Sequence, residues 1–113
     1  MEKEVVFESR DGMLIASVGI EIDHHSERRI RELIDEELFL RRPSVLIIDF
    51  SAVKFMDSSG IALVLGRVQT ARAVGANVRL CGACEPIMKL MRLSGMDRVK
   101  DLSISPSSPL RTR

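Results

Sequence analysis

The chain has 113 residues, 45% of them hydrophobic and 29% charged, which is typical of one soluble globular domain. Its 17 Lys and Arg residues nearly balance 16 Asp and Glu residues, so no strong net charge attracts nucleic acid or an anionic membrane. No apolar run is long enough to cross a bilayer, and the charged start at Met1–Glu4 is unlike a secretory signal. With only two cysteines, we expect a cytoplasmic protein without a disulfide scaffold. Nothing in the sequence requires an oligomer, so we expect a monomer.

The chain begins with a predicted β-hairpin. Two apolar, β-prone runs, Val5–Arg10 and Met13–Val18, flank the dipeptide Asp11-Gly12. Asp-Gly favours the tight turn in which both central residues have positive φ. We therefore expect two antiparallel strands at the start of the domain.

The rest of the chain alternates between helical and strand patterns. We expect three helices: one from a cap at Asp23 or Ser26 to about Phe39, one from Asp57 or Ser58 to Gly75, and one from Pro86 to Gly95. The third helix should face inward with Ile87, Leu90, Met91 and Leu93. Strands are expected at Val45–Phe50, Val78–Cys81 and Val99–Ile104. The order β-β-α-β-α-β-α-β predicts a single α/β domain with a mixed, mainly parallel sheet and helices packed on it. Residues 1–104 would form this domain and residues 105–113 a flexible tail.

The most informative motif is Phe55-Met56-Asp57-Ser58-Ser59-Gly60-Ile61, where a predicted strand leads into a helix. Free backbone N–H groups and the helix dipole favour negative charge at such a point. Asp57 or Ser58 can simply cap the helix. Alternatively, Ser58 is a phosphoacceptor or a nucleophile, although Met56 replaces the first glycine of the hydrolase Gly-x-Ser-x-Gly turn.

A second polar motif, Asp23-His24-His25-Ser26, precedes the first predicted helix. Adjacent histidines do not face one metal, and the chain has no further histidine. We therefore predict no metal site. The motif can form a structural turn and cap, or it can supply a base to Ser58.

The two cysteines form a Cys-x-x-Cys pattern, Cys81-Gly82-Ala83-Cys84. Such a pair before a helix can be a redox dithiol, which makes a small thiol oxidoreductase one alternative function. The simpler interpretation places Cys81 inward on a strand and Cys84 in a loop. A single pair is insufficient for a structural zinc site.

Four segments together resemble the anti-sigma factor antagonists of the STAS domain family, most closely the sporulation stage II antagonists of the anti-sigma F factor. The segments are Gly19–Ser26, Asp49–Ala52, Phe55–Ile61 with Leu65–Arg67, and Leu90–Gly95. The resemblance extends over roughly residues 5–104.

The resemblance implies a regulatory protein rather than an enzyme, without a cofactor. In this family the serine equivalent to Ser58 is phosphorylated by the anti-sigma factor, which is itself a serine kinase. The unphosphorylated antagonist binds the nucleotide-bound kinase and releases the sigma factor, and a serine phosphatase restores it. The expected partner-binding residues are Asp23, His24, Asp57, Ser58, Ser59 and Gly60. A STAS module of another partner-switching complex, in a stress response or in phosphatase regulation, is the alternative within the same fold.

Overall fold

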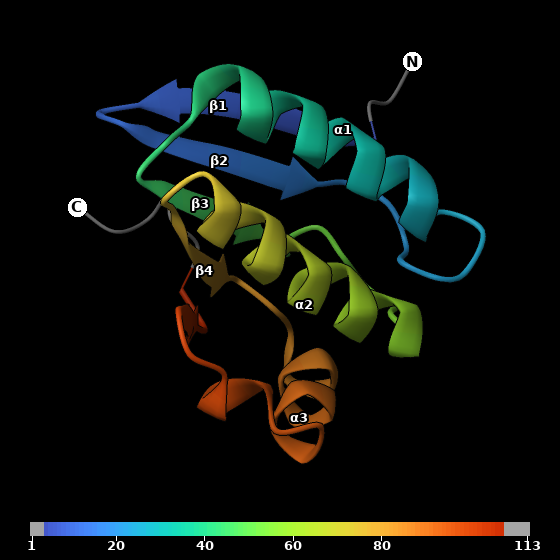
Figure 1. The fold of residues 1–113 in the computed structure, drawn as a ribbon. Helices are drawn as coiled ribbons and strands as arrows, with labels where there is room; N and C mark the ends of the chain where they lie inside the picture. The colour runs from blue at the N-terminus through green and yellow to red at the C-terminus, as the bar shows by residue number, and fades with distance from the viewer. Residues whose placement is uncertain (1–3, 108–113) are drawn as a thin grey trace.

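The computed structural model describes residues 4–107, which form a five-stranded sheet with helices on one face (Figure 1). The elements are β1 (Val5–Arg10), β2 (Met13–Val18), α1 (Glu27–Arg41), β3 (Val45–Asp49), α2 (Ser58–Ala73), β4 (Asn77–Cys81), α3 (Glu85–Leu93), the 3-10 helix η1 (Met96–Arg98) and β5 (Leu102–Ser105). The predicted α/β class and the order of strands and helices are confirmed. None of the helices in residues 4–107 is long and apolar enough to cross a membrane.

The sheet follows the chain, in the order β1-β2-β3-β4-β5. Only β1 and β2 are antiparallel, and the other neighbouring strands are parallel. The predicted hairpin turn is present, with φ of 52° at Asp11 and 79° at Gly12. Because β2, β3 and β4 run in the same direction, the loops that follow them leave from the same edge of the sheet.

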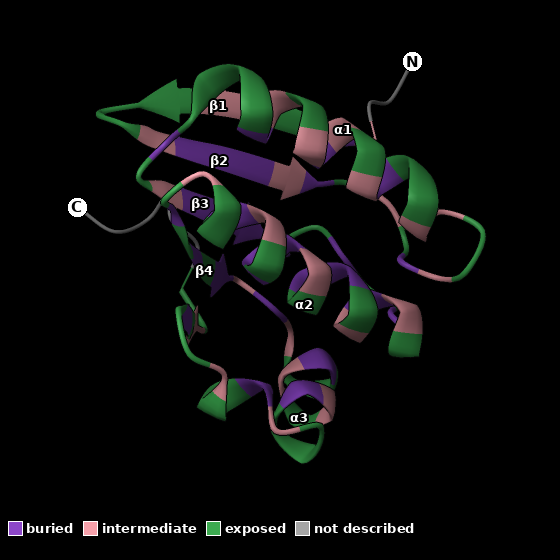
Figure 2. Cartoon of the chain, in the orientation of Figure 1, coloured by how far each residue is buried: buried purple, intermediate pink, exposed green. Residues whose placement is uncertain are grey.

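The core lies between the sheet and its single helical layer. Ile30, Ile34 and Leu38 of α1 are fully buried, and their spacing of four residues places them on one face of the helix. Helix α2 packs beside α1 and over β4, and it buries Leu63 and Val64. Figure 2 shows the buried residues on the facing sides of these elements and the exposed residues on the outer sides of the helices.

The ends of several elements differ from the sequence prediction. Helix α1 continues to Arg41 and ends where Arg42 adopts the left-handed conformation, with φ of 47°. The last strand begins at Leu102 rather than Val99, because η1 and a turn with φ of 68° at Asp101 precede it.

Leu93, predicted to face inward, is 78% exposed, so this prediction is wrong. The buried stripe of α3 consists of Ile87 and Met91, four residues apart on one face. Leu93 follows Met91 by two residues, which places it on the other side of a helix. Leu90, also predicted to face inward, is half-buried.

The chain after β5 is described only in part. Ser105, the first residue of the predicted tail, pairs with Cys81 in the sheet. The rest of that prediction mostly concerns residues 108–113, which lie outside the described residues.

Candidate functional site

The two polar motifs of the sequence meet at the carboxyl edge of the sheet. Ile22 forms a parallel bridge with Met56. The N–H of Ile22 donates to the carbonyl of Phe55 at 3.1 Å, and the N–H of Asp57 donates to the carbonyl of Ile22 at 3.1 Å. The bridge holds the Asp23 loop beside the start of α2, and both lie on the right of Figure 1.

Asp57 is the residue that caps α2. Its Oδ1 accepts a hydrogen bond from the N–H of Ser59 at 2.8 Å, and its backbone is extended, as is usual at a helix cap. Ser58 is therefore the first residue of the helix rather than its cap. Its side chain is exposed, and the hydroxyl makes no hydrogen bond within residues 4–107. A reactive group from outside can reach this hydroxyl directly.

Asp23 uses its carboxylate within its own loop. Its Oδ1 accepts hydrogen bonds from the N–H groups of His25 and Ser26, at 2.9 Å and 3.1 Å. These backbone hydrogen bonds, the one from Ser26 first, hold the pKa of Asp23 below its usual value. The carboxylate makes no hydrogen bond to Ser58 among the described contacts. Asp23 thus fixes the turn into α1, while its negative charge stays near the start of α2.

The two histidines of the loop stack on each other at the surface. The ring centroids of His24 and His25 are 3.9 Å apart and the rings are tilted by 39°. Both side chains are exposed. No group of three or more metal-ligating side chains occurs in residues 4–107. His24 is thus available for contact with a partner.

Gly60 and Ser59 differ from Ser58 in their surroundings. Gly60 is buried, and a Cβ at this position would lie 2.1 Å from Cγ of Met56. The motif therefore needs glycine here for close packing of helix and loop. Ser59 is half-buried and lines a groove between α1 and α2 of about 230 Å3.

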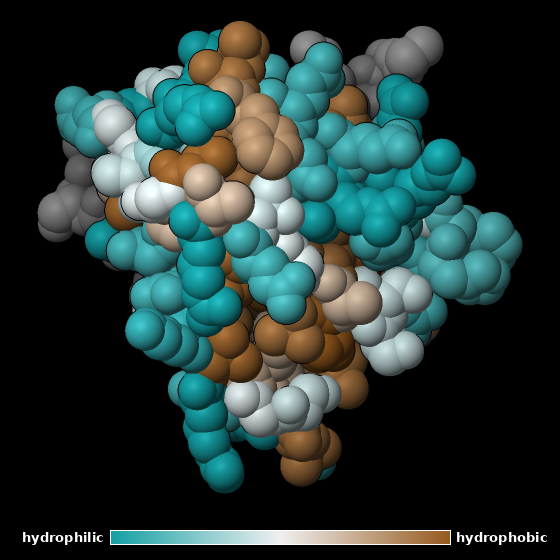
Figure 3. Space-filling view, viewed as in Figure 1, coloured by the Kyte–Doolittle hydropathy of each residue, from teal (hydrophilic) through white to brown (hydrophobic). Residues whose placement is uncertain are grey.

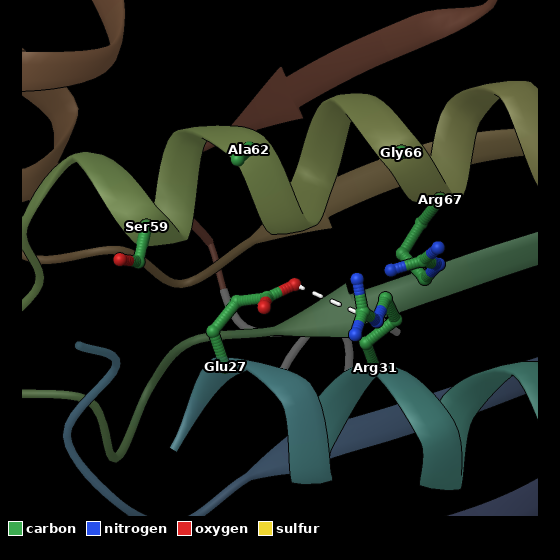
Figure 4. A pocket seen from close by; sticks show the side chains of 6 residues that line it. All are labelled: Glu27, Arg31, Ser59, Ala62, Gly66 and Arg67. Atoms are coloured by element: carbon green, nitrogen blue, oxygen red, sulfur yellow. Dashed lines mark ion pairs between the residues drawn. The ribbon is translucent and has the colours of Figure 1, made fainter. Parts of the chain in front are cut away.

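Charged side chains line this groove, a feature that the sequence analysis missed. Figure 4 shows Glu27 and Arg31 reaching from α1 and Arg67 from α2. Glu27 and Arg31 form an ion pair of 3.8 Å, and Nε of Arg67 lies 2.7 Å from Oδ1 of Asp35. Arg67 is only 4% exposed. An arginine four residues after buried Leu63, within an apolar helical stripe, was the available signal.

Burial opposes ionisation in the Asp35–Arg67 pair. It raises the pKa of the Asp35 carboxyl and lowers the pKa of the Arg67 guanidinium. The opposite charges partly offset these shifts, because Arg67 lowers the pKa of Asp35 and Asp35 raises the pKa of Arg67. The guanidinium also donates a long hydrogen bond, 3.4 Å, to the carbonyl of Leu63. This pair links the two helices that carry the candidate site.

The cysteines are free and occupy the positions expected of structural residues. Cys81 is buried at the end of β4, and Cys84 is the half-buried cap residue of α3. Burial raises the pKa of the Cys81 thiol, and the carboxylate of Asp49 raises it further. A redox-active thiol needs the opposite shift, so the structure disfavours the oxidoreductase alternative.

The fold and this site define a STAS domain: the family model for that domain matches residues 4–108, and the chain belongs to this family. Within the family, the chain is similar to anti-sigma factor antagonists. The chain is 28% identical over 99 residues to the anti-sigma F factor antagonist of Paenibacillus polymyxa, covering 88% of this chain and 85% of that protein. It is 33% identical over 88 residues to the anti-sigma F factor antagonist of Lysinibacillus sphaericus, covering 78% and 74%.

Solved structures lead to the same family. The anti-sigma factor antagonist SpoIIAA in its unphosphorylated form has a TM-score of 0.74 at 28% identity, covering 88% of this chain and 86% of that chain. SpoIIAA of Bacillus in its phosphorylated form has a TM-score of 0.66 at the same 28% identity, covering 88% and 89%. Anti-sigma factor antagonists are regulatory binding proteins, and the resemblance predicted from the sequence is confirmed.

Proposed function

We propose that this protein is a cytoplasmic antagonist of an anti-sigma factor that is switched by phosphorylation of Ser58. The unphosphorylated form binds an anti-sigma factor serine kinase in its nucleotide-bound state, and the sigma factor is released. Phosphorylation ends the interaction, and a serine phosphatase restores the binding form. The observation that carries the proposal is the exposed Ser58 hydroxyl at the first position of α2, beside the Asp23 loop.

A phosphate on Ser58 is compatible with the fold. Phosphoserine carries about −1.5 to −2 charges at neutral pH, and the start of a helix stabilises negative charge. Ser58 itself does not cap α2, because Asp57 does. Phosphorylation therefore leaves the cap in place and the domain folded.

The same phosphate changes the surface that a partner meets. Asp57 directly precedes Ser58, and the bridge between Ile22 and Met56 holds the Asp23 loop beside the start of α2. Phosphorylation adds charge of the same sign as these two carboxylates. A partner that covers this region must then remove the phosphate from water, which costs several kcal/mol unless the charge is paired. A change of about 1.4 kcal/mol already alters affinity tenfold. Charge at one residue is therefore sufficient for a switch.

Apolar surface near Ser58 provides area for docking. Figure 3 shows hydrophobic surface over α2 and α3, whereas much of the outer face of α1 is hydrophilic. Phe55, just before the cap of α2, is 49% exposed, and Leu65 of α2 is 37% exposed. Exposed large apolar side chains beside polar groups are typical of protein interfaces. We place the kinase contact on this side of α2, with His24 and Ser59 at its polar edge and the buried Gly60 packed beneath it.

The test is phosphorylation by the cognate anti-sigma kinase with ATP, followed by mapping of the modified residue. We expect modification at Ser58, none in Ser58→Ala, and normal modification in the control Ser103→Ala, which removes an exposed serine from β5. Ser58→Ala should keep its stability within about 0.5 kcal/mol, as for surface substitutions generally. It should also bind the kinase and stay bound in ATP. Modification of another residue, or release of Ser58→Ala by ATP, would contradict the proposal.

A further inference from the structure

A hollow on the opposite face of the sheet is not used by the proposed function. Its floor is apolar: Ile15 of β2 and Ile47 of β3 lie side by side, each only 4% exposed, with Met13 and Cys81 beside them. These residues form a small cluster that is separate from the main core. The cavity has a volume of about 260 Å3.

Two arginines border this apolar floor. Arg79 of β4 is the register partner of Ile47, and Arg10 of β1 is the register partner of Met13. Both line the cavity, and no acidic side chain does so among the described residues. Glu8 forms an ion pair with Arg10. Arg79 has no ion-pair partner within residues 4–107.

Asp49, an acidic residue on the same face of the sheet, is already engaged. Asp49 lies two residues after Ile47 in β3, opposite Cys81. Its carboxylate accepts hydrogen bonds from the N–H and hydroxyl of Ser51 and a long one, 3.4 Å, from the hydroxyl of Ser17. It does not line the cavity. Asp101 lines a neighbouring hollow together with Arg79, but its carboxylate pairs with Arg72. The positive charge at Arg79 is thus left for a ligand.

We propose that this hollow binds a small amphiphilic carboxylate, with its carboxylate on Arg79 and its hydrocarbon body on Ile15, Ile47 and Met13. Small-molecule sites in proteins combine an apolar floor with a few polar groups that fix orientation. A guanidinium binds a carboxylate with two parallel hydrogen bonds. The carboxylate lies at the Arg79 side, and the hydrocarbon points toward Met13 and away from Asp49.

Straight-chain carboxylates of increasing length are the probe. We expect hexanoate, heptanoate and octanoate at millimolar concentrations to shift the methyl NMR signals of Ile15, Ile47 and Met13. Each added methylene should tighten binding about fourfold, from about 0.8 kcal/mol per buried methylene, until the cavity is full. Octanol, which has the body without the charge, and acetate, which has the charge without the body, should bind at least tenfold more weakly than octanoate.

Variants separate this site from general binding to an apolar surface. Arg79→Gln should weaken octanoate binding tenfold or more, whereas the control Arg28→Gln, on the exposed face of α1, should leave it unchanged. Neither change should alter Ser58 phosphorylation, so the site stands or fails independently of the proposed function. Equal binding of octanol, unchanged binding by Arg79→Gln, or shifts confined to the helical layer would overturn the proposal.

Discussion

Gly60→Ala tests how tightly α2 packs against the loop that carries Ser58. A Cβ at Gly60 would lie 2.1 Å from Cγ and 2.2 Å from Sδ of Met56. Met56 is itself only 6% exposed, so its side chain has little space to move away. Overpacking of this kind costs about 1–3 kcal/mol, while alanine in place of glycine stabilises a helix by roughly 0.5–1 kcal/mol. We expect a net loss of about 1–2 kcal/mol.

Gly66→Ala is the matched control on the same helix. Nothing lies within 4 Å of a Cβ at Gly66, so we expect a gain of roughly 0.5–1 kcal/mol. Urea unfolding of both variants measures the free energies, and a loss of 1 kcal/mol should also lower Tm by roughly 4 °C. In a Met56→Ala background, Gly60→Ala should become neutral or stabilising. Equal stabilities of the Gly60 and Gly66 variants would refute this packing argument.

Three further predictions concern other parts of the domain. Asp35→Asn should destabilise the protein by roughly 3 kcal/mol, because it leaves the buried guanidinium of Arg67 without its counter-charge. Arg67→Met should cost less, because the Asp35 side chain that it leaves unpaired is 27% exposed to water. Urea unfolding that gives the opposite order would contradict this reasoning. The pKa of Asp23, measured by NMR titration, should lie below the usual aspartate value. The contribution of this carboxylate to stability is then complete above the usual aspartate pKa and is lost as the pH falls through the lower pKa of the folded state. A titration midpoint at the usual value would show that the hydrogen bonds of the loop are absent in solution. Joint replacement of Cys81 and Cys84 by Ala should leave partner binding at the wild-type affinity in reducing and oxidising buffer alike. A wild-type affinity that depends on redox conditions, and loses this dependence in the variant, would restore the dithiol interpretation.

Local signals made most of the fold predictable. The Asp11-Gly12 turn, the apolar run of β3 and the spacing of Ile30, Ile34 and Leu38 each specify one element through neighbouring residues. The start of α2 at Ser58 was also within reach, because Asp57 caps it through a contact two residues away. Where such local rules apply, a single sequence is sufficient.

Long-range contacts explain what the sequence analysis missed. The Asp35–Arg67 pair joins residues 32 positions apart on different helices, and no local pattern indicates which acidic residue Arg67 meets. The packing of Gly60 on Met56 likewise depends on how the loop folds back onto α2. The position of Leu93 was predicted wrongly because α3 has only nine residues, and so short a helix has too few apolar residues to show which face is buried. The contacts of these residues depend on the tertiary structure rather than on residue type.

The bridge between Ile22 and Met56 has a consequence for recognition. Two backbone hydrogen bonds join chain segments more than thirty residues apart, so Asp23 stands beside Ser58 only when β2, β3 and both loops are in place. A partner that contacts both segments recognises a discontinuous epitope. For such a partner, binding would require the folded chain, and a peptide with the sequence of the start of α2 would lack the Asp23 loop. Under the proposed function, copies of the chain that have not folded would therefore not bind the partner.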